Sequence, residues 1–269
     1  MGDEGKAPGR RRAQPAVSLP TGGQAVVCLS GGMDSCVTAA TARAQGYELF
    51  LCHVTYHQRT WRRELQAFRD IARFYHVPEN RQLVAELPHL GRIGGSSLTD
   101  RTRPVLHSEP DGGSIPETYV PFRNTQLLAA AVAWAEVVGA GAVYFGANEV
   151  DYSGYPDCRG AYFRAYQILI NLGTRPETHI RLVTPLLRLS KADIVRRGRE
   201  LGAPLELSWS CYEREDQACG LCGSCRLRRQ AFQEAGVPDP IPYVGGQPPT
   251  SPPAGRSPSA GEGPIAGGS

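Results

Sequence analysis

Two hydroxyl groups, two glycines and a carboxylate are gathered in residues 30–35, with the sequence SGGMDS. Glycines allow a tight turn with no Cβ between the backbone and a ligand, and successive N–H groups in such a turn bind anions. A helix that follows the turn would add the positive end of its dipole. The segment therefore predicts a phosphate-binding loop, whose contacts are assigned to Ser30, Gly31, Gly32, Asp34 and Ser35.

Asp34 has a different chemistry from the rest of this loop. An ionised carboxylate only accepts hydrogen bonds, so it suits a magnesium ion or a backbone donor rather than a phosphate. The loop lacks the Gly-Lys-Ser/Thr ending of the Walker pattern and the glycine spacing of the dinucleotide fingerprint. The alternative reading is an ordinary glycine turn before a helix, with Asp34 and Ser35 as capping residues.

Four cysteines near the C-terminus form a second group suited to chemistry. The segment CYEREDQACGLCGSC covers residues 211–225 and contains two C-x-x-C steps that share one cysteine. Four thiolates at this spacing suit a closed tetrahedral zinc site, which is structural because no coordination position is left for water. Free thiols, a redox pair and an iron–sulfur cluster are the alternatives. The predicted ligands are Cys211, Cys219, Cys222 and Cys225.

Hydrogen-bonding groups are also dense in the segment DYSGYPDCR, residues 151–159. Loops at strand ends often carry binding residues. The carboxylates of Glu149, Asp151 and Asp157 could accept from the N–H edge of a purine-like ring. The ring of Tyr155 could stack on that ligand. A polar turn without a ligand is the alternative.

Strands and helices must alternate to position these groups. The predicted strands are 25–29, 47–55, 81–86, 142–146 and 180–183. The predicted helices are 35–44, 61–75, 125–138, 161–172 and 190–201. This alternation predicts an α/β fold, a doubly wound parallel sheet with helices on both faces. Ligands bind such sheets outside the carboxyl ends of the strands, where residues 30–35 would lie.

Composition divides the chain into four expected parts. Residues 1–23 and 245–269 are poor in residues that can be buried, and we expect both to be disordered. Residues 24–206 form the expected α/β domain. Residues 207–244 form a small zinc-binding module, packed on the domain through a basic helix over 226–234. Arginines of that helix could contact RNA, although a solvated helix face is the commoner reason for such charges.

Charge and hydropathy limit the function classes. The chain has 269 residues and a net charge of +3, too small by itself to indicate nucleic-acid binding. It has no run of about eighteen apolar residues and no apolar stretch after its basic N-terminus, so neither a membrane span nor a signal peptide is expected. We expect a cytoplasmic protein. An enzyme acting directly on tRNA would need a basic appendage, and only the residues 10–12 and 226–229 resemble one.

The loop at residues 30–35 resembles the Ser-Gly-Gly-Xaa-Asp-Ser loop of the pyrophosphate-binding ATPases. From Val26 to about Tyr243 the chain is similar to the 7-cyano-7-deazaguanine synthase family of the queuosine pathway. The shared motifs, in order, are SGGMDS, TYHQR with Glu64, SSLT at 96–99, VPFRN at 120–124, the Gly146 segment with DYSGYPDCR and Phe163, TPL at 184–186 with Lys191, and SCY with the four cysteines.

This resemblance implies an adenine nucleotide alpha hydrolase-like fold and an ATP-dependent carbon–nitrogen ligase. ATP, with magnesium, would activate the carboxylate of 7-carboxy-7-deazaguanine by adenylation. Ammonia would displace AMP to give the amide, and a second ATP would activate the amide oxygen so that elimination gives the nitrile. Arg123 and Lys191 are the predicted cations for phosphate or adenylate, and together with Asp34 they form the predicted catalytic set. The resemblance also implies a homodimer, and from hydropathy and charge we expect no membrane and no direct nucleic-acid partner.

Two places depart from the family pattern. Phe122 stands where the family usually has Gly, and a phenyl group there is expected to fill part of the pocket or redirect its loop. The usual Tyr-Gly-Gln-Arg-His is Tyr-His-Gln-Arg-Thr at residues 56–60, so a histidine is lost at Thr60 and another appears at His57. Loss of a general acid–base group costs roughly a hundredfold or more.

Two alternatives follow. One is a diverged ligase that adenylates 7-carboxy-7-deazaguanine but stops at the amide or joins it to another amine, a small molecule or a protein. The other is a non-catalytic interaction module containing zinc. The intact loop at 30–35 together with Lys191 argues against the second alternative.

Overall fold

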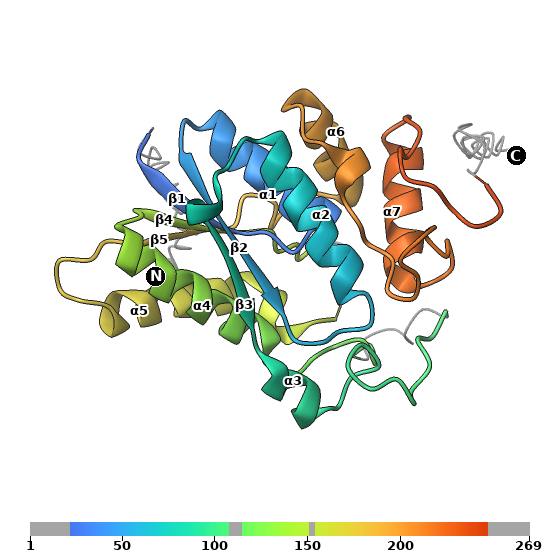
Figure 1. Cartoon of the computed structure of the whole chain (residues 1–269), viewed down its shortest axis with the longest axis horizontal. Helices are drawn as coiled ribbons and strands as arrows, with labels where there is room; N and C mark the ends of the chain where they lie inside the picture. The colour runs from blue at the N-terminus through green and yellow to red at the C-terminus, as the bar shows by residue number, and fades with distance from the viewer. Residues whose placement is uncertain (1–21, 108–114, 151–153, 247–269) are drawn as a thin grey trace, which may run out of the picture.

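A parallel sheet of five strands forms the centre of the protein (Figure 1). The computed structural model describes residues 22–107, 115–150 and 154–246. The strands are β1 (Gln24–Cys28), β2 (Glu48–Thr55), β3 (Gln82–Glu86), β4 (Ala142–Phe145) and β5 (Arg181–Val183). Their order in the sheet is β3-β2-β1-β4-β5, and every neighbouring pair is parallel. The predicted doubly wound sheet is confirmed.

Helices cover both faces of the sheet. One face carries α1 (Met33–Ala44), α2 (Trp61–Phe74), α6 (Lys191–Glu200) and α7 (Gly223–Glu234). The other carries α4 (Arg123–Val138) and α5 (Gly160–Gly173). A short helix, α3 (Pro88–Ile93), follows β3 below the sheet in Figure 1. Three 3₁₀ turns complete the elements of the described residues: η1 (Glu79–Arg81), η2 (Pro156–Cys158) and η3 (Leu205–Leu207).

The central strand β1 shows why the sheet needs helices on both sides. Ala25 and Val27 belong to the core under α1, whereas Val26 and Cys28 belong to the core under α4 and α5. Successive side chains of a strand point to opposite faces, so an unbroken apolar run requires cover on both. The run AVVC meets that requirement, and all four residues are buried.

The order of the strands also fixes where a ligand can bind. β1 and β4 are neighbours, but the chain leaves β1 for α1 on one face and leaves β4 for α5 on the other. The loops that follow these two strands therefore diverge. A crevice forms at such a topological switch point, outside the carboxyl ends of the strands.

The cysteine-rich segment is joined closely to the sheet domain. Ala231 and Phe232 of α7 lie in the same core as residues of α1 and β1, so this helix packs against the sheet domain. Arg228 is buried and forms an ion pair with Asp239, with Nε 2.8 Å from Oδ2. A solvated face or an RNA contact is therefore excluded for Arg228. The boundary expected near residue 206 stays a prediction.

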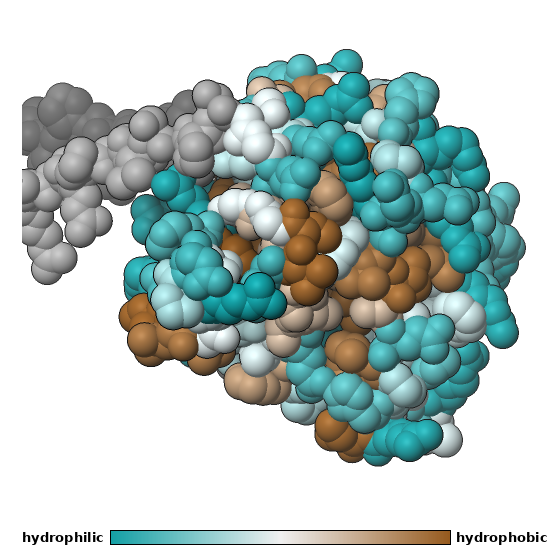
Figure 2. All heavy atoms as spheres, turned by 60° about the vertical axis from the view of Figure 1, so that its left-hand side comes forward, coloured by the Kyte–Doolittle hydropathy of each residue, from teal (hydrophilic) through white to brown (hydrophobic). Residues whose placement is uncertain are grey.

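The surface mixes hydrophilic and hydrophobic residues. On the face drawn in Figure 2 the hydrophobic residues form several separate groups among hydrophilic ones. Scattered exposed apolar side chains of this kind are normal for globular proteins and need no partner to explain them. Within the described parts of the chain, no helix has the length and apolar character needed to cross a membrane.

Candidate active site

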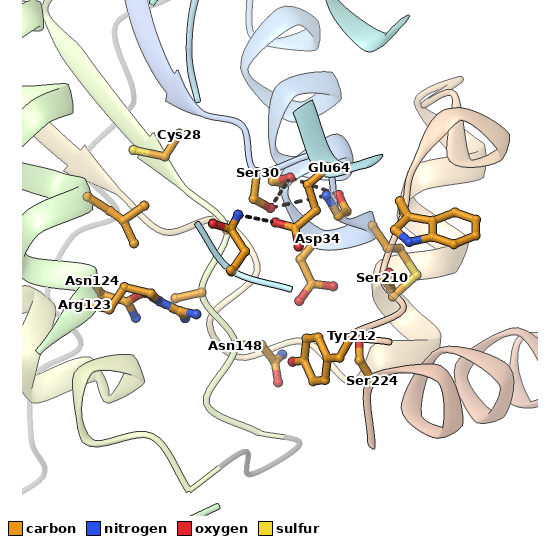
Figure 3. A pocket seen from close by; sticks show the side chains of 18 of the residues that line it. Cys28, Ser30, Asp34, Glu64, Arg123, Asn124, Asn148, Ser210, Tyr212 and Ser224 are labelled. Atoms are coloured by element: carbon orange, nitrogen blue, oxygen red, sulfur yellow. Dashed lines mark hydrogen bonds between the residues drawn. The ribbon is translucent and has the colours of Figure 1, made fainter. Parts of the chain in front are cut away.

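A pocket opens at the carboxyl ends of β1, β2 and β4 (Figure 3). Segments far apart in the sequence line it: the loop between β1 and α1, the start of α2, the first turn of α4, residues 145–148 after β4, the first residue of α6, and the segment 209–212. The pocket therefore occupies the crevice that the strand order creates. The predicted phosphate loop lies at its centre.

The two glycines of the loop have different tasks. Gly31 has a φ of +92°, and a Cβ there would lie 2.5 Å from the carbonyl oxygen of Glu64 in α2. Only glycine therefore allows the loop to lie against that helix. Gly32 lines the pocket, and its nearest neighbour would be Ser30 Oγ at 3.4 Å from an added Cβ. Backbone approach by a ligand was predicted for both glycines, and the geometry leaves room for it at Gly32.

The serine hydroxyls hold the turn from both sides. Ser35 Oγ donates to the carbonyl of Gly32 at 2.9 Å, and Ser30 Oγ accepts from the N–H of Gly32 at 3.3 Å. The two hydroxyl oxygens lie 3.1 Å apart. Ser30 is exposed and Ser35 is buried, so Ser30 is the hydroxyl more accessible to a ligand.

Asp34 and Lys191 form an ion pair across the mouth of the loop. Lys191 Nζ donates to Asp34 Oδ2 at 2.5 Å, joining the first turn of α1 to the first residue of α6. The other carboxylate oxygen, Asp34 Oδ1, is buried and accepts no hydrogen bond from the described residues. Lys6 and Lys191 are the chain's two lysines, so the structure places an uncommon side chain at the pocket.

Arg123 supplies a second positive charge from the opposite wall. It is the first residue of α4, and its Nη1 donates to the hydroxyl of Tyr56 at 3.2 Å. Its guanidinium carbon lies 5.9 Å from the ring centre of Tyr155. Among the described residues no carboxylate forms an ion pair with Arg123. Its charge can therefore meet an anion that enters the pocket.

Aromatic hydroxyls surround this arginine. Tyr56, Tyr155 and Tyr212 line the same part of the pocket. The hydroxyl of Tyr155 lies 2.7 Å from Thr118 Oγ1. Burial raises the pKa of both Tyr56 and Tyr155, so these phenols stay protonated at neutral pH and can donate hydrogen bonds.

Glu149 and Asp157, two of the carboxylates predicted for the substrate, are not among the residues that line the pocket with Tyr155. Glu149 is exposed and lies beside Gly160 at the start of α5. Asp157 is buried, and its Oδ2 accepts from the N–H of Asn124 at 2.9 Å. Asp157 therefore caps the helix that presents Arg123. Asp151 lies outside the described residues, and the binding roles given to these carboxylates stay predictions.

The four predicted cysteines come together as expected. Their sulfur atoms all lie within 4.8 Å of one another. Backbone N–H groups of Glu213, Arg214 and Cys219 point at Cys211 Sγ, each at 3.4 Å. Such N–H···S contacts stabilise thiolates around a metal. The cluster is therefore compatible with one tetrahedral metal ion.

Comparison of the sequence with known proteins identifies the family of the chain. A family model described as queuosine biosynthesis protein QueC matches residues 24–236. The chain belongs to the QueC family. The match runs from β1 to just beyond α7, so it contains both the phosphate loop and the cysteine cluster.

Curated members of the QueC family are similar to the chain over most of its length. The 7-cyano-7-deazaguanine synthase of Chlorobium phaeobacteroides is 55% identical over 220 residues, 82% of this chain and 96% of that protein. The enzymes of the same name from Chlorobium luteolum and Chlorobaculum tepidum are 54% and 51% identical over the same shares. A structural match was found with a solved complex of a 4-thiouridine synthetase with RNA and bound ATP. The match covers 79% of this chain and 50% of that chain, with a TM-score of 0.45 and 20% identity, and this likeness is too small to support a conclusion.

The two departures from glycine in the QueC pattern have one structural explanation. His57 has a φ of +62° and Phe122 a φ of +57°, so both occupy the left-handed conformation that favours glycine. Both side chains are exposed, and Phe122 is not among the residues that line the pocket. The expectation that the phenyl group fills the pocket is wrong. Histidine and phenylalanine at these two positions therefore introduce some backbone strain but do not obstruct the pocket.

Thr60 is the departure that does reach the pocket. Its hydroxyl is buried, 2.9 Å from Glu64 Oε1 and 3.1 Å from the carbonyl oxygen of Cys211. The lost histidine is therefore replaced by a neutral hydroxyl beside a carboxylate.

Several pocket residues carried no assigned role in the sequence analysis, namely Tyr56, Gln58, Glu64, Asn124, Asn148 and Tyr212. Most of them stand in motifs shared with the family, such as TYHQR, VPFRN and SCY. That position in the motifs was the signal that could have identified them.

Proposed function

We propose that this chain is a 7-cyano-7-deazaguanine synthase, the activity for which its QueC relatives are named. The observation that supports this most directly is the pocket at the switch point. There an anion-binding loop, the Asp34–Lys191 pair and Arg123 face one space. Adenylation of a carboxylate needs phosphate charge to be neutralised and two anions to be brought together, and this arrangement can do both.

The loop and Lys191 bind the phosphates of ATP in this proposal. Ser30 offers a hydroxyl, Gly32 leaves room for a phosphate beside the backbone, and α1 adds its N-terminal dipole. The carboxylate of 7-carboxy-7-deazaguanine lies near Arg123 and attacks the α-phosphorus, so pyrophosphate leaves and an acyl-adenylate forms. Tyr155 and Tyr212 provide an aromatic wall for the deazapurine ring.

The second half of the reaction repeats this activation. Ammonia attacks the acyl carbon, the bond from that carbon to the AMP oxygen breaks, and the amide remains. The amide oxygen then attacks a second ATP and pyrophosphate leaves. Loss of two protons from nitrogen and of AMP from carbon gives the nitrile.

Two metals fit the residues present. Asp34 Oδ1 is a buried carboxylate oxygen without a hydrogen-bond donor, the hard oxygen ligand that magnesium prefers. Magnesium would neutralise phosphate charge when bound. The four cysteines fit zinc, which would hold the segment 211–225 in place and supply no chemistry of its own. We also propose a homodimer, as the family resemblance implies; light scattering should then give twice the chain mass of 29.1 kDa.

The experiment that tests this function is a product analysis. The purified protein is incubated with ATP, magnesium, ammonium and 7-carboxy-7-deazaguanine, and the small molecules are identified by mass spectrometry. The nitrile should appear together with AMP and pyrophosphate, and omission of ATP should abolish it. Accumulation of the amide alone, or no consumption of the substrate, would contradict the proposal.

A further inference from the structure

Glu64 is a pocket carboxylate to which the preceding mechanism gives no role. It lies in the first turn of α2, and its side chain lines the pocket in Figure 3. Gln58 Nε2 donates to its Oε2 at 2.9 Å, and Thr60 Oγ1 donates to its Oε1 at 2.9 Å. Each carboxylate oxygen thus has a fixed, uncharged partner. Within the described residues Glu64 forms no ion pair.

The surroundings of Glu64 raise the pKa of its carboxyl above the ordinary value. Loss of water around the half-buried side chain raises the pKa of its carboxyl, whereas the bonds from Gln58 and Thr60 and the charge of Arg123 on α4 lower it. Glu215 raises that pKa further, and the phenol of Tyr56 also interacts with Glu64. The other charged or titratable side chains that line the same pocket include Asp34, Arg59, Tyr155, Lys191 and Tyr212. The net direction is upward. Keeping a carboxylate charged costs free energy where it has little water around it and no cation paired with it. A small cation bound beside the carboxylate would reduce that free energy.

The geometry points to Glu64 as the residue that binds ammonium and accepts its proton, an inference that rests on the proposed synthase function. Ammonium has no lone pair and cannot attack an acyl-adenylate, so the reaction needs a base beside the nucleophile. Glu64 shares the pocket with Asp34 of the loop and with Arg123, and it is held by donors that do not neutralise it.

The step balances without a further reagent. Ammonium passes one proton to the Glu64 carboxylate and becomes ammonia. The nitrogen lone pair forms a bond to the acyl carbon, and the bond from that carbon to the AMP oxygen breaks with its electrons on AMP. The nitrogen then loses a second proton to water, and the amide remains. Glu64 returns its proton to solvent before the next turnover.

Gln58 and Thr60 act as positioning residues for this carboxylate. Gln58 lies within the TYHQR segment, and Thr60 directly follows that segment. The position of Thr60 is the one at which the family pattern usually has histidine. Thr60 fixes one oxygen of Glu64 and does not itself need to move a proton. The loss of that histidine is therefore compatible with complete amide formation.

The test compares two amines in the variant Glu64→Gln, because hydroxylamine is largely neutral at pH 7 and needs no base. We expect amide formation from ammonium at pH 7 to fall by about a hundredfold, while hydroxamate forms at close to the wild-type rate. The difference between the variant and the wild type in the rate of amide formation should become smaller as pH rises, because the fraction of free ammonia increases. Glu64→Asp, which keeps a carboxylate, should recover part of the activity. Asp70→Asn on the same helix is the matched control and should leave both products unchanged.

Two results would overturn the inference. One is an equal loss of hydroxamate and amide in Glu64→Gln, which would assign Glu64 to adenylation or folding. The other is an unchanged KM for ammonium with an unchanged pH profile. Failure of the proposed function would look different, because the wild-type protein itself would then form neither product.

Discussion

Lys191 is the residue on which the proposed ATP site depends most directly. It reaches the pocket from the first turn of α6, where a positive charge is opposed by the helix dipole. Its pairing with Asp34 offsets that cost and leaves the ammonium group beside the loop. In a chain whose other basic residues are arginines apart from Lys6, a compact charge has been placed where a phosphate is expected.

The scarcity of lysine allows a direct test of this assignment. An amine-selective acylating reagent should label Lys6 and Lys191, and saturating ATP with magnesium should protect Lys191 only. Peptide mass spectrometry measures both sites in one sample, so Lys6 serves as the internal control. Equal labelling of Lys191 with and without ATP would show that the nucleotide binds elsewhere.

Phe122 offers a test of the left-handed backbone at the start of α4. A non-glycine residue in this conformation costs roughly 1–2 kcal/mol, and glycine relieves this at a smaller entropic cost. Phe122→Gly should therefore raise the free energy of unfolding by up to about 1 kcal/mol, and kcat should not change. Denaturant titration gives the energy. The control Phe74→Gly, at an exposed phenylalanine in helical conformation, should destabilise the protein instead.

The sequence could predict these residues unevenly, for a physical reason. The loop at 30–35 and the four cysteines are short segments whose spacing already fixes their geometry. Glu149 and Asp157 lie in a connection whose side-chain directions depend on what packs against it. Asp157 turned to the N-terminus of α4, which no local pattern revealed.

At the scale of elements, β2 carries an unusual residue in its centre. His53 is fully buried, its Nδ1 lies 3.0 Å from the carbonyl oxygen of Leu29, and its ring packs 5.2 Å from that of Phe68. Nε2 has no hydrogen-bond partner in the described residues. Burial lowers the pKa of His53 from 6.5 to about 4, so the ring is neutral in the folded protein.

A pH dependence of stability follows. The unfolded chain binds the histidine proton more tightly, so the free energy of unfolding should fall as pH decreases from 6.5 to about 4. The difference in pKa corresponds to about 3 kcal/mol in all. His53→Phe should flatten this part of the profile, measured by denaturant titration at several pH values. His89→Gln, at an exposed histidine, should leave the slope as in the wild type.

The elements themselves were predictable because each carries its own periodic signal. All five strands and their neighbouring helices were identified to within a few residues. The helix α3 was missed because six residues containing Pro88 and Gly91 give no readable period. The start of α4 was placed late, because the left-handed residue that precedes the helix is a phenylalanine rather than the usual polar cap.

At the scale of the whole molecule, a buried ion pair secures the C-terminal segment. The side chains of Arg228 and Asp239 are 1% and 3% exposed. Arg228 Nη1 also donates to Ser208 Oγ at 2.7 Å. Arg228→Met would remove the cation that pairs with the buried carboxylate of Asp239, and loss of one member of a buried ion pair typically costs about 3–5 kcal/mol. The double variant Arg228→Met, Asp239→Leu should regain part of the lost stability, measured by thermal unfolding. The control Arg226→Met, on the same helix, should lower the stability only a little.

Metal removal should act on the pocket as well as on stability. Ser210 and Tyr212 flank Cys211 and both line the pocket. We expect chelation, or Cys225→Ser, to release one zinc per chain, lower the melting temperature and weaken ATP binding. Elemental analysis and calorimetry measure these effects. Cys158→Ser, outside the cluster, should keep its zinc; the prediction fails if Cys225→Ser keeps it too.

The hydrogen bond from the N–H of Trp209 to the carbonyl of Gly31, at 2.8 Å, has a consequence for the protein during its synthesis on the ribosome. The loop at 30–35 is translated before the segment around Trp209 that braces it. While the chain is still attached to the ribosome, the loop lacks this hydrogen bond until residue 209 has emerged. A nascent chain should therefore be unable to hold nucleotide before residue 209 has been added and has left the ribosome.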